Sequence, residues 1–287
     1  MRPANRWNLP NLGIGVGLRS NHYDHVVRKQ PQVDWFELIS ENFMAGGGRP
    51  LRIAEQVAAS YPLVLHGVSL SIGSTDPLDF EYLRRLKDLS DRLRPVWLGD
   101  HICWTGVAGH NSHDLLPLPY DEATLAHVVA RVRQVQDFLE RPLVLENAST
   151  YLEFAASSMP EQEFVARLAE AADCALLLDV NNVWVNHRNH GTDPIAYLDA
   201  MPYDRVVQIH VAGHADKGTH CIDTHEGPVI DPVWELLAEV EKRAPGRSIL
   251  LEWDTAIPEF DVVLAEARKA ERFLAAESRS GRAAAAE

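Results

Sequence analysis

Cysteine is scarce in this sequence, with three among 287 residues. Cys103, Cys174 and Cys221 lack the paired spacing of a disulfide framework, which fits a reducing compartment. Long apolar runs are missing too: no stretch approaches the ~20 apolar residues that a membrane span requires, and segment 1–10 lacks the apolar core of a signal peptide. These absences predict a cytoplasmic protein with no membrane partner.

Positive charge is also in short supply. The chain has 27 Lys and Arg against 41 Asp and Glu, a formal net charge of -14. Such a surface repels phosphate backbones unless a local basic groove overrides it, so no nucleic-acid partner is expected. The length allows either one α/β barrel or two ordinary domains.

Short apolar runs alternate with longer helical patterns along the chain. The eight apolar runs are 12–18, 34–40, 63–66, 95–101, 142–147, 175–180, 206–210 and 248–253. The clearest helical patterns are 77–93, 121–139, 161–172, 232–242 and 258–276. Nearly continuous apolar runs are typical of parallel strands buried on both faces, so the pattern predicts a closed (β/α)8 TIM barrel, with a doubly wound open sheet as the alternative.

Local signals refine the expected boundaries. Asp76-Pro77 and Asp231-Pro232 place a capping residue before a first-turn proline, which favours helix starts there. No linker or internal repeat interrupts the chain, so we expect a single TIM-barrel domain over 1–276. The low-complexity segment 277–287 is expected to be a disordered tail.

Each of six consecutive predicted strands has an acidic residue or a histidine at its carboxyl end. These residues are His66, Asp100, His101, Glu146, Asp179, His210 and Glu252, and the loops just beyond add Asn182, His187, His190, Asp223 and His225. In a TIM barrel the active site forms where the strands end at their carboxyl side. Buried charges at this mouth would be costly without cations to neutralise them, so the pattern predicts a metal site.

The segment 206–227 is the most crowded part of this pattern. His210, His214, His220, Asp223 and His225 fall within it. Asp223 and His225 are two positions apart, so in an extended segment both side chains leave on the same side and can reach one ion.

The potential ligands outnumber the positions around one ion. They are His66, His101, Glu146, Asp179, His210, Asp223, His225 and Glu252. Two or three ions that share bridging carboxylates would use them all, and Glu146 is the expected bridge. Nitrogen and carboxylate ligands without thiolate suit Fe, Zn or Mn, and their spacing does not separate these metals.

Nine motifs stand out along the chain, and they read GIGVGLR, WFELISENFM, HGVSLSIGS, LGDHICW, LENASTY, LDVNNVWVNHRNHG, QIHVAGH, DTHEGPV and ILLEWD. They resemble the DUF692 (UPF0276) family of multinuclear non-haem iron-dependent oxidative enzymes, and the match runs from about Gly13 to Glu252. The resemblance implies a xylose isomerase-like barrel that holds two or three iron ions. It places these residues at the metal-binding positions: His66, His101, Glu146, Asp179, Asn182, His210, Asp223, His225 and Glu252.

The resemblance also implies a reaction. Iron cycling between Fe(II) and Fe(III), with O2 as cosubstrate, would modify a small ribosomally made precursor peptide, often at cysteine, to give heterocycles or thioamides. A small partner protein commonly presents the peptide, and Phe43, Met44 and Trp104 are candidates for that interface. Candidate substrate-contacting or supporting residues are His190, His187, His214, Asn147, Ser69 and Asp100, with His190 favoured over His187.

Two other classes of protein share features with this pattern. The barrel and ligand order are similar to endonuclease IV, a zinc enzyme that cuts DNA, and a sugar-isomerase-like enzyme would use the same barrel. A His is expected in endonuclease IV where this chain has Asn182, and the acidic balance disfavours a DNA groove. A noncatalytic metal-handling protein is the third alternative.

Overall fold

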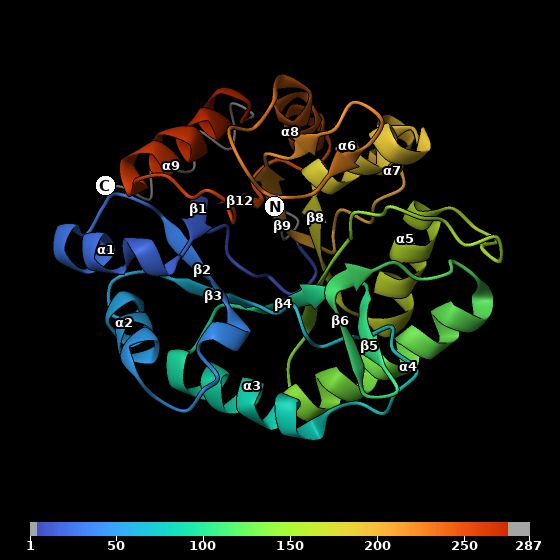
Figure 1. Ribbon diagram of the computed structural model, residues 1–287, viewed down its shortest axis with the longest axis horizontal. Coiled ribbons are helices and arrows are strands. Elements are labelled where there is room, and N and C mark those ends of the chain that lie inside the picture. Colours follow the sequence, from blue (N-terminus) through green and yellow to red (C-terminus); the bar gives the residue numbers. More distant parts are fainter. Residues whose placement is uncertain (1–4, 275–287) are drawn as a thin grey trace.

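Eight parallel strands close into a barrel in the computed structural model, which describes residues 5–274 (Figure 1). The strands are β1 (Ile14–Gly17), β2 (Trp35–Ile39), β3 (Leu63–His66), β4 (Leu98–His101), β7 (Leu143–Glu146), β8 (Ala175–Asp179), β9 (Val206–Ala212) and β12 (Ser248–Glu252). Their order around the barrel is β1-β12-β9-β8-β7-β4-β3-β2, and β1 pairs with β2 to close it. All eight predicted strands are confirmed, although β9 continues two residues beyond His210. The closed barrel excludes the open sheet.

Helices form the outer ring around the strands (Figure 1). The predicted ones are α3 (Phe80–Leu93), α4 (Glu122–Leu139), α5 (Glu161–Ala172), α8 (Asp231–Arg243) and α9 (Phe260–Ala267), which continues as the 3-10 helix η3 (Arg268–Arg272). None of the helices within residues 5–274 is long and apolar enough to cross a membrane. The expected domain end at 276 and the tail 277–287 lie outside the described residues.

Of the two helix starts predicted at Asp-Pro pairs, the one at Asp76-Pro77 is wrong. α3 begins three residues after Pro77, because the Asp79 carboxylate accepts hydrogen bonds from the backbone N–H groups of Glu81 and Tyr82 and so caps the helix there. The start at Asp231-Pro232 is confirmed to within one residue, because Pro232 lies in the first turn of α8, although Asp231 is itself the first helical residue and not the cap. Its carboxylate complements the positive end of the helix dipole from inside the first turn.

The sequence patterns missed four helices and two hairpins. The helices are α1 (Tyr23–Lys29), α2 (Arg49–Ala58), α6 (Val180–His190) and α7 (Pro194–Asp199). One hairpin pairs β5 (Trp104–Val107) with β6 (His110–Leu116). The other pairs β10 (Ala215–Asp216) with β11 (Cys221–Ile222), within the histidine-rich segment 206–227. Both hairpins follow the carboxyl ends of barrel strands, so they add walls to the mouth.

The barrel interior has an apolar floor and a polar mouth. The floor consists of Trp35, Val64, Trp97, Val144, Ala175, Leu177, Val207 and Leu250. Side chains on a strand alternate between its two faces, so the residue two positions after an inward apolar residue also points inward. Glu146 follows Val144 in this way, and Glu252 follows Leu250. The alternation that builds the core therefore also delivers polar side chains to the mouth.

Candidate metal centre

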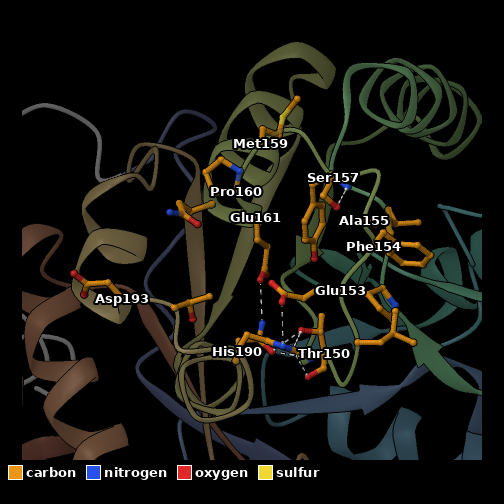
Figure 2. A pocket seen from close by; sticks show the side chains of 17 residues that line it. Thr150, Glu153, Phe154, Ala155, Ser157, Met159, Pro160, Glu161, His190 and Asp193 are labelled. Atoms are coloured by element: carbon orange, nitrogen blue, oxygen red, sulfur yellow. Dashed lines mark hydrogen bonds and ion pairs between the residues drawn. The ribbon is translucent and has the colours of Figure 1, made fainter.

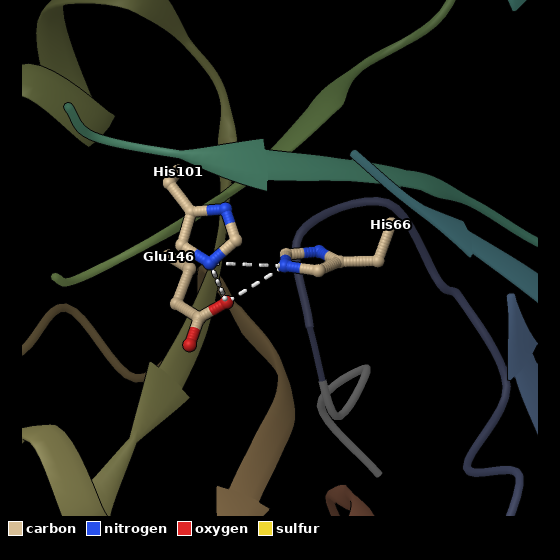
Figure 3. Close-up of side chains that lie close together, drawn as sticks. All are labelled: His66, His101 and Glu146. Carbon is tan, nitrogen blue, oxygen red and sulfur yellow. Dashed lines mark hydrogen bonds and ion pairs between the residues drawn. The ribbon is translucent and has the colours of Figure 1, made fainter. Parts of the chain in front are cut away.

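The first group of ligand atoms comes from the ends of three neighbouring strands, β3, β4 and β7 (Figure 3). Glu146 Oε2 lies 2.8 Å from His66 Nε2 and 3.2 Å from His101 Nε2, and the two imidazole nitrogens are 3.4 Å apart. Ligands bound at about 2.1 Å to one ion are separated by about 3.0–3.5 Å. The three atoms therefore form one face of a coordination polyhedron.

The second group adjoins the first inside the barrel and comprises Glu146, Asp179, His210 and Glu252. His210 Nδ1 lies 3.0 Å from Glu252 Oε2, 3.6 Å from Glu146 Oε1 and 3.8 Å from Asp179 Oδ2. Glu146 directs Oε2 to the first group and Oε1 to the second. A carboxylate placed in this way can bridge two ions.

The third group contains His225, Glu252 and Asp254 at the outer edge of the mouth. His225 Nδ1 lies 3.3 Å from Glu252 Oε2 and 3.2 Å from Asp254 Oδ2. Asp223 lies outside this group, because its Oδ1 faces the other ring nitrogen, 2.8 Å from His225 Nε2. That Asp223 and His225 bind one ion stays a prediction. Asp254 is the most accessible of these ligands, with a side chain 33% exposed.

Several buried polar atoms in these groups make no well-aligned hydrogen bond within the described part of the chain, although some of them lie close to another ligand atom. They are Glu146 Oε2, Asp179 Oδ2, Asn182 Oδ1, His210 Nδ1 and His225 Nε2. An unsatisfied buried polar atom costs about 1–3 kcal/mol, and more when it is charged. Because carboxylate oxygens and imidazole nitrogens converge here without well-aligned hydrogen bonds between them, the residues fit divalent cations.

Without a metal, some of the ligand side chains bind protons more tightly than they would in water. Burial lowers the pKa of His66, but the Glu146 carboxylate 2.8 Å away and the negative charge of Glu37 outweigh it and raise that pKa to about 9. Burial and the Glu146 charge hold the pKa of Asp179 well above its usual range. Metal binding must displace these protons, so its affinity falls as the pH falls.

Asp179 and two asparagines hold the second group in place. The Oδ1 atom of Asp179 accepts the backbone N–H of Asn182 at 2.6 Å and caps α6, which leaves Oδ2 for the group. The Asn147 side chain donates to the backbone O of Asp179 and accepts its N–H, at 3.0 and 2.9 Å. Asn182 donates to the backbone O of Asn147 at 3.0 Å, while its Oδ1 has no partner among the described residues.

Asp100 and His214 lie one contact away from the groups. Asp100 accepts the backbone N–H groups of His101 and Leu70 at 2.7 and 3.2 Å, so it fixes the loop that follows β3. His214 Nδ1 lies 2.8 Å from Asn181 Oδ1, and Asn181 donates to Asp223 Oδ1 at 2.8 Å. Asp100 therefore contacts the backbone of His101, and His214 reaches Asp223 through Asn181, while the supporting role of both residues stays a prediction.

Other expected residues stand apart from the three groups. His187 Nδ1 lies 2.7 Å from the backbone O of Thr192, and Ser69 is exposed. His190 Nε2 lies 2.8 Å from Thr150 Oγ1 and lines a neighbouring pocket. Phe43 is only 2% exposed, so the expectation that it lies on an exposed interface is wrong. Its ring packs into the core beside Tyr23.

The sequence patterns missed Glu37, Gln208 and Asp254. Glu37 is 1% exposed on β2, where its Oε2 accepts a hydrogen bond from Gln208 Nε2 at 2.6 Å and lies 3.3 Å from His210 Nε2. A carboxylate on one imidazole nitrogen orients the other nitrogen toward a metal. Both Glu37 and Asp254 could have been found from the sequence. Glu37 is the lone charged residue in the apolar run 35–39, and Asp254 is two positions after Glu252, so both side chains point to the same side of an extended segment.

A pocket of about 640 Å³ lies near the end of α6, and Figure 2 shows the side chains that line it. Its walls come from the loop after β7, the start of α5 and the end of α6. Glu161 lies within it, and its carboxylate accepts hydrogen bonds from Tyr197 Oη and Asn186 Nδ2, both at 3.0 Å. The two donors are neutral, so these partners bring no compensating positive charge.

Glu161 makes stability depend on pH in a direction that can be tested. Burial raises its pKa to about 7, so the folded protein holds this proton more tightly than the unfolded chain and loses stability as the pH rises toward and through 7. As the pH rises from 5 to 8, the free energy of unfolding of Glu161→Gln should increase by about 2 kcal/mol relative to that of the unaltered protein. Thermal or urea unfolding at both pH values measures this, and parallel pH profiles would contradict it.

The fold and the site together define a class of protein, the TIM barrels whose mouth is lined by histidine and carboxylate side chains. The structure is similar to L-ribulose 3-epimerase, with a TM-score of 0.59 and 13% identity over 95% of this chain and 96% of that chain. It is also similar to endonuclease IV from Thermus thermophilus, with a TM-score of 0.59 and 15% identity over 92% and 98%. At such identities the likeness shows the fold alone, and it confirms the predicted barrel.

Within this class, the chain belongs to the RiPP precursor modification enzyme family MbnB/TglH/ChrH, whose family model matches residues 13–275. A UPF0276 protein from Anaeromyxobacter sp. (strain Fw109-5) is 54% identical over 90% of this chain and 92% of its own length. Another, from Acaryochloris marina (strain MBIC 11017), is 50% identical over 91% and 95%. The resemblance stated from the motifs is therefore confirmed.

Proposed function

We propose that this protein is a multinuclear non-haem iron enzyme that uses O2 to modify cysteine in a ribosomally made precursor peptide, with thioamide or heterocycle formation as the outcome. The observation that carries the proposal is the sharing of two carboxylates, Glu146 and Glu252, among three groups of ligand atoms. Family membership supports the peptide as substrate. Nitrogen and oxygen ligands suit Fe, with Zn and Mn as chemically similar occupants.

Each ligand has a defined place in this proposal. The first ion would be held by His66, His101 and Glu146. The second would be held by Glu146, Asp179, His210 and Glu252, with Asn182 adjacent. The third would be held by His225, Glu252 and Asp254, with Asp223 on the far ring nitrogen. When bound, the iron supplies redox equivalents and open positions for a thiolate and O2. The protein holds the ions close together with shared carboxylates and restricts water, since Glu146, Asp179 and His210 have no exposed surface.

The peptide would enter at the third group, because this end of the site is the accessible one. Asn182, Asn186 and His190 follow one face of α6 at four-residue spacing and lead from Glu146 to the pocket in Figure 2. This row covers about 12 Å. An extended peptide advances about 3.3 Å per residue, so a residue three or four positions from the modified cysteine would reach the pocket.

A small peptide-presenting partner protein and a cytoplasmic location also belong to this proposal, as does a single domain over 1–276. Met44 and Trp104 remain the candidates for the partner interface, since both are partly exposed at the mouth.

A zinc hydrolase of the endonuclease IV type is the second candidate, favoured by the shared barrel. Asn182 stands where a histidine ligand is expected in that enzyme, and the net charge of -14 disfavours DNA. A metal-handling protein is disfavoured because the ligands surround an open barrel mouth.

The test uses protein purified without oxygen after growth in iron-supplemented medium. We expect two to three irons per chain by elemental analysis and a magnetically coupled Mössbauer signal. With a cysteine-containing peptide encoded by a small neighbouring gene, the iron-loaded protein should consume O2 and change the peptide mass. Full zinc occupancy with cleavage of abasic-site DNA would establish the hydrolase instead, and iron-loaded protein that consumes no O2 with its peptide would refute the oxidative function.

A further inference from the structure

Arg19, just past the end of β1, contacts two of the carboxylates at the mouth. It is 8% exposed. Its Nε donates to Asp254 Oδ1 at 2.8 Å, its Nη2 contacts the same oxygen, and Nη2 also lies 3.3 Å from Glu252 Oε1. One guanidinium therefore binds one oxygen of each carboxylate.

The remaining oxygen of each carboxylate faces the opposite way, toward histidine. Asp254 Oδ2 lies 3.2 Å from His225 Nδ1. Glu252 Oε2 lies 3.3 Å from His225 Nδ1 and 3.0 Å from His210 Nδ1. Both carboxylates are thus divided between Arg19 on one side and the metal-ligating atoms on the other.

We propose that Arg19 is a positioning residue for the third ion. It binds the outer oxygens of Glu252 and Asp254, so that their inner oxygens converge with His225 Nδ1 on one metal position. This inference rests on the proposed function, because it requires a metal at the third group.

The physical reason is the repulsion between two adjacent carboxylates in a partly buried site. Without a cation between their outer oxygens, each would rotate to separate the charges, and the inner oxygens would no longer converge. Guanidinium is planar and carries several donors, so it can hold two carboxylates in fixed directions. The compact ammonium of lysine lacks that geometry, so lysine should preserve the positive charge but should not fix the orientation of the two carboxylates.

The neighbouring backbone leaves room for Arg19. A Cβ added at Gly17 would lie 2.6 Å from Arg19 Nη1. Glycine at this position therefore allows the guanidinium to lie flat against the end of β1. The ion pairs of Arg19 within the described chain go to Glu252 and Asp254, so its effect should be confined to the third ion and the Glu252 side of the second.

The experiment titrates metal-free protein with Fe(II) under anaerobic conditions and follows stoichiometry and affinity for each equivalent. In Arg19→Met and Arg19→Lys, the dissociation constant of the third equivalent should rise by about 10–100-fold, the usual effect of losing a residue that orients a ligand. The first equivalent should stay within about threefold, because Arg19 supports no ligand of that ion. Arg247→Met is the matched control, because Arg247 is equally buried but bonds to backbone carbonyls beside the opposite end of β12.

The outcomes separate this inference from the proposed function. Unchanged or tighter binding of the third equivalent in Arg19→Met would overturn the positioning role, and tighter binding would identify Arg19 as a competing cation. Unaltered protein that binds two equivalents and no third would also overturn it, while the two-ion centre would stand. Unaltered protein that binds no iron would refute the proposed function itself.

Discussion

Replacing Glu146 by glutamine is expected to remove at least half of the bound metal and to reduce activity by roughly 100–1000-fold. Glu146 directs Oε2 to His66 and His101 and Oε1 to the group around His210. A neutral amide offers one weakly basic oxygen in place of two charged ones, so two groups lose a ligand together. Elemental analysis of anaerobically purified protein and assay of peptide modification measure the two effects.

Glu161→Gln is the matched control for this prediction. Glu161 is also an inward carboxyl at the same end of the barrel, but its partners are Tyr197 and Asn186. Its replacement should leave the metal content unchanged. A Glu146→Gln protein that is folded by circular dichroism and still holds its full metal complement would contradict the bridging role.

The barrel itself was predictable because of its physical simplicity. A parallel strand covered on both faces is largely apolar, and this makes runs such as Leu143–Glu146 stand out from their surroundings. The polar residue that ends such a run lies at the mouth, because the carboxyl ends of all the parallel strands meet there. Expectations for His66, Glu146 and Glu252 followed from the fold class alone, and the structure brings these residues into shared groups.

The helix α6 shows where local pattern reasoning fails. Its sequence is VNNVWVNHRNH, rich in asparagine and β-branched residues that have low helix propensity. The helix forms because the Asp179 carboxylate caps its first turn and because Asn182 and Asn186 bond to the loop after β7. The bonds to that loop are tertiary contacts, which no window of sequence contains.

The division into three groups also lay beyond the sequence. Glu37 and His210 are separated by 173 positions and meet only because β2 and β9 curve around the same barrel. Which inward side chains meet depends on strand tilt and register, and both are properties of the closed sheet. The position of Asp254, in contrast, was predictable. Alternate residues of an extended segment point to the same side, which predicts that Asp254 lies beside Glu252 as it predicts that Asp223 lies beside His225.

Replacing Gly99 by alanine is expected to disable the first group without touching any ligand. Gly99 lies opposite His66 in the register of β3 and β4. A Cβ at this position would lie 2.6 Å from His66 Nδ1 and 3.3 Å from the backbone O of Val144. The backbone cannot yield, so the imidazole must move away from His101 and Glu146. Affinity for the first ion should fall by about 10–100-fold, and overpacking should cost about 1–3 kcal/mol of stability.

Gly47→Ala provides the control, because a Cβ there meets no atom of the described residues within 4 Å. It should change neither metal content nor unfolding temperature. The comparison separates the loss of backbone freedom common to both substitutions from the displacement of His66. If Gly99→Ala retained every ion at unchanged affinity, His66 would have room to turn and still bind, and its close contact with Glu146 would then reflect only a buried ion pair. Loss of one ion with the other two retained would instead show that the ring is held at one metal position by the space that glycine leaves beside it.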